Sequence, residues 1–228
     1  DNDMVTKGGP KTGSSTTIHL RVVNESELRT DLLRREKEQR QVLTGILKAQ
    51  DELLTDTQAY LADTRTMEKL DNDRLSSLIK LQRLQKLQGT NLKPMVERID
   101  GIIAEIQNNR LEEEDGVLKR RLRTKVLNPM SKLWEEAVPV ATQQLERARR
   151  APDEIELRNG ILEDTIVRQR AIMVVIQKIL VNMVRDEDFQ QAVNLLYEMQ
   201  KLQSDLFKKT EAEKAARLKE LIDQGNKK

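Results

Sequence analysis

The chain has 228 residues, of which 34% are charged and 2% are aromatic, and 40 basic against 38 acidic residues leave a net charge of only +2. It holds no cysteine, nine glycines and five prolines. These values exclude a zinc ribbon, a disulfide scaffold and a Gly/Pro-rich disordered chain, and they disfavour a β-sandwich. They predict an all-α fold, an elongated antiparallel bundle of long coiled-coil-like helices with one short N-terminal strand.

The first 23 residues differ in pattern from the rest of the chain. Residues 1–16 are rich in Gly, Ser and Thr and predict a flexible linker. Residues 17–23 alternate, with Ile18, Leu20 and Val22 on one face, which predicts a β-strand. A lone strand has unpaired backbone groups, so we expect it to be the remnant of an upstream domain.

The first helix is expected to begin after Asn24, a good N-cap, with Glu27 as its capping-box partner, and to run to about Thr66. Apolar residues recur in it every seven positions, a spacing that favours packing along one seam. Polar residues fall in the gaps of this seam and predict a weak zipper. The apolar residues are Ile46, Leu53, Tyr60 and Met67, and the polar ones are Gln50, Thr57 and Thr64.

The second helix is expected to start near Asp71. Leucine recurs in it every three residues, at positions 75, 78, 81, 84 and 87, so the apolar stripe winds around the helix and needs more than one neighbour. The stretch from Gly89 to Pro94 predicts a kink or a break.

Turn signals divide the remaining sequence. Residues 108–116 predict a turn, Pro129 and Pro139 predict kinks or starts in a third helical stretch, and residues 149–152 predict a boundary. A fourth helix is expected over 153–184, with its apolar segment 171–184 as the most buried element. A fifth is expected from Asp186 to about 221. Residues 24–228 therefore predict one bundle of about five long helices.

Residues suited to catalysis are scarce. His19 is the only histidine and lies outside the helical region, so neither a histidine-assisted nucleophile nor a Glu-x-x-His di-iron site is predicted. The acidic run Glu112 to Asp115 lacks the ligand spacing of a calcium loop, which favours a solvated turn at a helix start. We expect a non-enzyme with no catalytic, cofactor-binding or metal site, no cofactor and no small-molecule substrate.

One basic segment is a candidate anion-binding patch, and it consists of Lys119, Arg120, Arg121, Arg123 and Lys125. With Arg147, Arg149 and Arg150 it would suit anionic lipid or nucleic acid. No aromatic residue interleaves it, so base stacking and a nucleic-acid partner are not expected. The alternative is that these cations pair with acidic faces of neighbouring helices.

Three stretches resemble the C-terminal helical region of large, poorly characterised bacterial proteins that are membrane-anchored upstream and have a β-rich portion before the helices. The stretches are residues 21–23, 27–40 and 188–196. The resemblance covers most of residues 17–228. It implies a fragment of an envelope-associated protein, with the strand at 17–23 as the last strand of a missing domain, and it implies no catalytic residue.

Two functions follow from these observations. The first is a non-enzymatic structural or interaction module, a scaffold or spacer that meets protein partners along its helical faces. The alternative is a membrane-surface scaffold that binds anionic lipid through the basic segment. The apolar leucines at 75–87 exceed what about five helices are expected to cover, which predicts a weak homodimer through helix faces.

Overall fold

The computed structural model describes residues 23–112 and 116–225, and from residue 185 onward mainly the backbone. None of the described residues is in a strand, so the all-α prediction is confirmed. The predicted linker at 1–16 and strand residues 17–22 lie outside the described residues, and Val23 precedes the first helix without regular structure.

Four helical rods form the described fold, rather than the five expected. The third rod is an uninterrupted series of α-helical and wider π-helical turns. The rods are α1 (Glu25–Thr64), α2 (Asn72–Asn108), the third rod with α3 (Val117–Arg121), η1 (Leu122–Leu127), α4 (Asn128–Lys132), η2 (Leu133–Ala137) and α5 (Val138–Arg150), and α6 (Ile155–Gly225).

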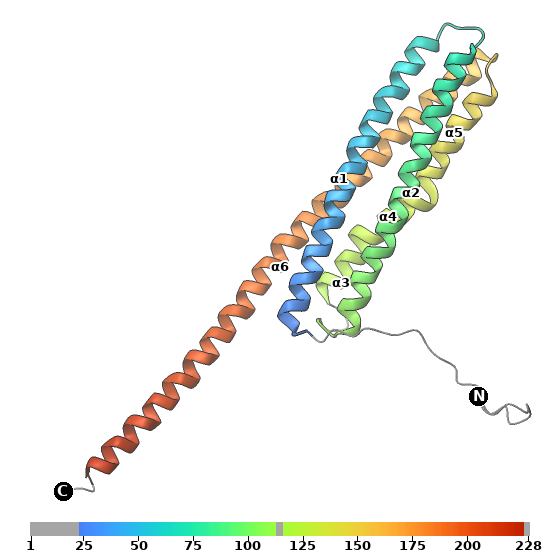
Figure 1. Ribbon diagram of the computed structural model, residues 1–228. Helices are drawn as coiled ribbons and strands as arrows, with labels where there is room; N and C mark the ends of the chain where they lie inside the picture. Colours follow the sequence, from blue (N-terminus) through green and yellow to red (C-terminus); the bar gives the residue numbers. More distant parts are fainter. Residues whose placement is uncertain (1–22, 113–115, 226–228) are drawn as a thin grey trace, which may run out of the picture.

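The rods make an up-down-up-down bundle from which α6 projects (Figure 1). The packed neighbours are α1 with α2, α2 with the third rod, the third rod with α6, and α6 with α1. Short connections between long helices enforce this antiparallel order. In Figure 1, α6 runs beside α1 and then continues well past the bundle.

The helix starts and turns agree with the sequence signals. The side chain of Asn24 accepts a hydrogen bond from the Glu27 N–H at 2.8 Å, and Asp71 accepts one from the Arg74 N–H at 2.8 Å. Each cap satisfies a backbone donor that has no partner within its helix. The predicted boundaries at 108–116 and 149–152 are both present.

Prolines within the rods do not break them. The expected break at Gly89 to Pro94 is wrong, because α2 is continuous through both residues. Leu92 and Met95 are buried in the core on either side of Pro94 and hold the adjacent turns in place. Packing over many residues outweighs the roughly 3 kcal/mol that an interior proline costs.

The third rod accommodates its two prolines by widening. The N–H of Asn128, just before Pro129, donates to the carbonyl of Arg123, five residues back. The N–H of Val138, just before Pro139, donates to that of Leu133 in the same way. A proline ring collides with the carbonyl four residues before it, and a wide turn moves that carbonyl away. The expected kinks or starts are therefore two π-helical turns.

The core consists of two apolar clusters with a polar layer between them. The larger cluster includes Ile46, Leu92 and Ile172, and the smaller one includes Leu53, Leu81 and Ile166. In three of the rods, a fully buried glutamine lies in the sequence between the residues of the larger cluster and those of the smaller one. These glutamines are Gln50 of α1, Gln85 of α2 and Gln169 of α6, and buried Gln144 occupies the corresponding position of α5. We call this set the glutamine layer.

Hydrogen bonds connect the glutamine layer across the core. Gln85 Nε2 donates to Gln50 Oε1 at 3.0 Å, and Gln169 Nε2 donates to Gln85 Oε1 at 3.0 Å. Gln169 Nε2 also lies 3.2 Å from the hydroxyl oxygen of Thr57, which itself donates to the Leu53 carbonyl. Gln50 and Thr57 therefore do not merely interrupt the α1 seam, since they belong to its buried face and pair with other rods.

The far end of the bundle is tied together by Arg158, which is fully buried. Its guanidinium donates to the carbonyls of Thr64 at 3.1 Å, Met67 at 2.5 Å and Pro152 at 2.5 Å. One side chain of α6 thus links the α1–α2 connection with the turn that precedes α6. Burial beside this cluster raises the pKa of Tyr60 to about 12.

The prediction that residues 171–184 form the most buried element is wrong. Within 171–184, Ile172, Ile176, Ile179 and Met183 are buried, whereas Val174, Val181 and Val184 are exposed. The expected boundary at Asp186 is also absent. No glycine or proline occurs between Gly160 and Gly225, so nothing in this stretch forces the helix to end.

The leucine repeat of α2 winds as the sequence predicts. Leu78 and Leu81 are buried, and two turns later Leu87 is 48% exposed. The buried face of α2 continues instead through Gln85, Gln88 and Leu92, which keep the spacing of three and four residues.

Replacing Gln85 by leucine should destabilise the bundle by about 1–3 kcal/mol, because Gln50 and Gln169 each lose a buried hydrogen-bond partner. Urea unfolding measures this loss. Replacing Gln50, Gln85 and Gln169 together by leucine removes all three amides and should recover most of the stability. A single variant as stable as the parent would show that the layer contributes little.

Alkaline pH should destabilise the bundle through Tyr60. The pKa of its hydroxyl is raised in the folded state, so its contribution is complete below about pH 10 and is lost as pH rises toward 12. Tyr60→Phe should therefore unfold less steeply than the parent between pH 10 and 12, while the two melt alike near pH 8. Parallel pH dependences of the two proteins would contradict the assignment.

Candidate functional site

The basic segment lies at the end of the bundle where the third rod begins. Arg120, Arg123 and Lys125 are exposed, whereas Lys119 and Arg121 are partly buried and have interaction partners. The five predicted residues follow the helix around rather than along one face. Three of them are therefore available as a cationic surface.

The arginines at 147–150 do not join this surface. They lie on the same continuous rod, and Arg147 is 22 residues beyond Lys125, or about 33 Å along a helix. Arg150 pairs instead with Glu146, one helical turn away. The combined patch considered from the sequence is not assembled.

A carboxylate and an arginine fix the start of the third rod. Glu112 accepts hydrogen bonds from the backbone N–H groups of Leu118 at 3.2 Å and Lys119 at 3.0 Å, so it caps α3 from outside the helix. Arg29 of α1 donates to the carbonyl of Leu111. For Glu112, the expectation that the acidic run provides favourable charge at a helix start is confirmed, and residues 113–115 lie outside the described residues.

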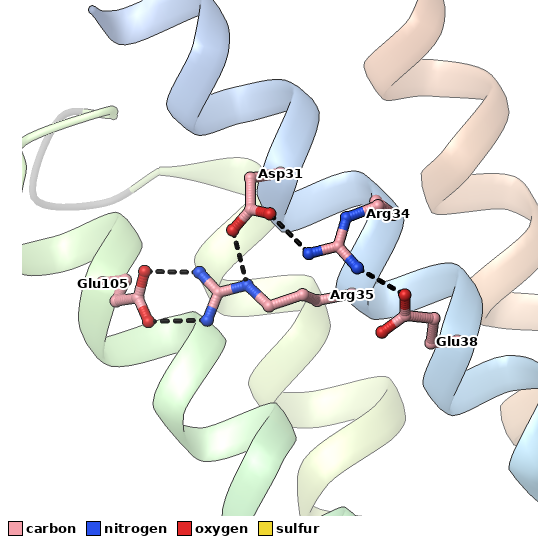
Figure 2. Close-up of polar contacts among 5 residues, drawn as sticks. All are labelled: Asp31, Arg34, Arg35, Glu38 and Glu105. Carbon is pink, nitrogen blue, oxygen red and sulfur yellow. Dashed lines mark hydrogen bonds and ion pairs between the residues drawn. The ribbon is translucent and has the colours of Figure 1, made fainter. Parts of the chain in front are cut away.

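A chain of ion pairs joins α1 to α2 (Figure 2). Arg35 binds both carboxylate oxygens of Glu105, at 2.8 and 2.5 Å, and its Nε lies 3.0 Å from Asp31. Arg34 lies 2.6 Å from Asp31 and 2.5 Å from Glu38. The hydrogen bond to Glu105 is the main cause of the raised pKa of Arg35.

In these pairs, Arg34 and Arg35 of α1 are neutralised by nearby carboxylates. Arg34 pairs with two carboxylates of α1, whereas Arg35 pairs with one carboxylate of α1 and with Glu105 of α2. A bidentate arginine–carboxylate pair is geometrically specific, although partial exposure keeps its energy small. This surface neutralises itself and is therefore not an anion-binding site.

An open groove lies beside the two π-helical turns. Its polar lining includes Asn128, Ser131, Lys132 and Glu135, and Val175 of α6 forms part of its wall. Trp134 packs against the larger core cluster from the same rod, and Lys93 of α2 lies 5.9 Å from the centre of its ring. Wide turns often occur at functional sites, but the mixed charges of this groove indicate no particular ligand.

The projecting part of α6 is long. Met183 is the last described residue of α6 in the core cluster, and the helix continues to Gly225. The 42 residues from Val184 onward span about 63 Å at helical rise. On this part Met199 is 57% exposed.

Within the described ranges, no cluster of histidine, cysteine or acidic side chains has the arrangement of a metal site. No helix in the described part of the chain is long and apolar enough to cross a membrane.

Comparisons of the chain with protein-family models, curated proteins and solved structures found no match. The family resemblance expected from the sequence therefore stays a prediction.

Sequence reasoning missed three features. It did not identify the glutamine layer, although glutamines such as Gln85 continue the spacing of three and four residues that the buried apolar residues of their helices follow. It did not identify the π-helical turns, although each precedes a proline. It also assigned the exposed valines of α6 to the core. Exposed Val174 and Val181 are seven residues apart, as are buried Ile172 and Ile179, so the spacing alone does not distinguish the two faces.

Proposed function

We propose that the chain is a non-enzymatic structural and interaction module in which the bundle is the base and the projecting part of α6 is an arm. The arm carries a contact surface for a helical protein partner at a fixed distance from the base. The same module acts as a spacer, because one continuous helix sets the separation between its two ends.

The observation that carries this proposal is the length of α6 relative to its packed part. The helix has 71 residues, about 107 Å, and Met183 is its last described residue in a core cluster. Most helices in proteins draw their stability from packing an apolar face. A 42-residue extension with an exposed apolar side chain at Met199 therefore supports a role in binding another helix.

The base is suited to hold such an arm. The part of α6 inside the bundle contributes Ile172, Ile176 and Ile179 to the larger core cluster and Arg158 to the ties between connections. These contacts anchor the helix over almost 30 residues, so movement of the arm relative to the bundle requires loss of core packing or bending of the helix.

Deleting residues 185–228 should leave the bundle folded and remove its partner contact. We expect the shortened chain to melt within about 3 °C of the full chain, because every described residue of the two core clusters lies before residue 185. A melting temperature lower by 10 °C or more would show that the arm is needed for folding, contrary to the proposal.

Photo-crosslinking in cells tests the contact itself. A photoreactive residue at Met199 should give a discrete protein adduct, whereas one at Val42, an exposed apolar position on α1, should not. Adducts from position 42 alone would place the contact on the bundle and contradict the proposal.

A second candidate function rests on the exposed cations Arg120, Arg123 and Lys125. These side chains would suit a surface of anionic lipid, with each contributing about 1 kcal/mol near such a membrane. Vesicles with and without phosphatidylserine test this alternative by co-sedimentation. Salt-sensitive binding that is lost in Arg120→Glu with Arg123→Glu would support it, and equal binding to both vesicle types would reject it.

A further inference from the structure

Among the described residues of α6, five of the six exposed large apolar side chains lie on one side of the helix, and the sixth, Leu157, lies outside that side. Val167, Val174 and Val181 are 62%, 46% and 54% exposed and recur every seven residues. Val184 and Met199 are 42% and 57% exposed. At 100° per residue, all five lie within an arc of about 100°. We call this set the valine stripe.

The valine stripe lies opposite the buried face of the helix. The core residues Ile172, Ile176 and Ile179 are centred roughly 150–180° around the helix from it. On α1 and α2, exposed large apolar residues occur singly, as Val42 and Leu87. Single exposed apolar residues are normal, but a row at a seven-residue spacing is the pattern of a helix seam.

We propose that the valine stripe docks a second copy of this chain, α6 against α6 in antiparallel orientation. This inference rests on the proposed interaction role of α6 and names one partner for it. A seam with a seven-residue repeat is complementary to a seam of the same period, and a second copy supplies that seam by two-fold symmetry.

The geometry of the bundle permits this pairing. Because the stripe and the core face lie on opposite sides of α6, the two bundles would lie on the outer sides of the helix pair without colliding. A contact over about 24 residues is about 36 Å long and 10 Å wide, which buries on the order of 700 Å² in total. Stable interfaces exceed about 1,000 Å², so the dimer is weak and depends on concentration.

Charge selects the antiparallel orientation. Arg170 is exposed and lies within the stripe. A parallel pair would set Arg170 against its own copy. An antiparallel pair centred near residue 179 instead separates the two copies of Arg170 by about 27 Å along the helix pair. The same register sets Val174 opposite Val184, so an apolar layer lies within the contact on each side of the two-fold axis.

Sedimentation equilibrium of the full chain from about 2 to 200 μM tests the docking. The parent should pass from monomer to dimer, and Val174→Gln with Val181→Gln should weaken association at least tenfold. The matched control Val42→Gln replaces an equally exposed valine on α1 and should leave the association unchanged. Circular dichroism checks that each variant is folded.

A parent that stays monomeric throughout, or a stripe variant that associates like the parent, would overturn the proposal. Met199 lies outside the roughly 24-residue contact centred near residue 179, so crosslinking at Met199 to a different protein tests the proposed contact of the arm whichever of these results is obtained.

Disulfide trapping tests the orientation, since the chain has no native cysteine. A mixture of Val174→Cys and Val184→Cys chains should form a crosslinked dimer more readily than either variant alone, because the antiparallel register sets position 174 opposite position 184. Equal or greater crosslinking of Val174→Cys with its own copy would overturn the antiparallel arrangement.

Discussion

The glutamine layer fixes the axial and rotational position of α6 in the bundle, and the rest of the structure depends on that position. Gln169 pairs with Gln85 of α2 and lies beside Thr57 of α1, and among the described side chains of α6 it is the one buried amide that meets another amide. A shift of α6 by one turn would move this amide among apolar side chains and leave Gln85 without its donor. Buried polar groups of this kind fix register at some cost in stability.

Two consequences follow from the position of Gln169 along and around α6. Its axial position determines which part of α6 lies inside the bundle and which part projects beyond Met183. Its rotational position turns the isoleucines inward and the valine stripe outward. The arm and the stripe are thus both consequences of one buried hydrogen-bonded layer, because α6 is a continuous helix without an internal glycine or proline after Gly160.

Much of the fold could be predicted from local signals. Asn24 and Asp71 are strong N-caps, and their helices begin where the residues indicate. The breaks expected at Pro94 and Asp186 do not occur. A proline costs a few kcal/mol, which the core contacts of Leu92 and Met95 outweigh, and an aspartate within an exposed helical surface costs far less. Whether a helix continues through such a residue depends on its contacts with other helices, and the local sequence does not show those contacts.

The candidate surfaces were less predictable. The basic residues at 119–125 are found from their clustering, but only the structure separates exposed Arg123 from partly buried Arg121. The segment 171–184 is so rich in apolar residues that its pattern does not reveal which side faces the core. That assignment required the partners of Gln169, which lie 84 and 112 residues away in sequence.

The central claim is that α6 is one rigid helix from the bundle to the arm. Spin labels at Val167→Cys and Met199→Cys test it directly, since the chain has no native cysteine and both positions are exposed. Dilution with unlabelled protein removes distances between copies. Thirty-two residues of uninterrupted helix predict a narrow distribution near 48 Å between the two backbone positions. A broad distribution, or a distance of about 20 Å from an arm folded back at residues 185–188, would contradict the account.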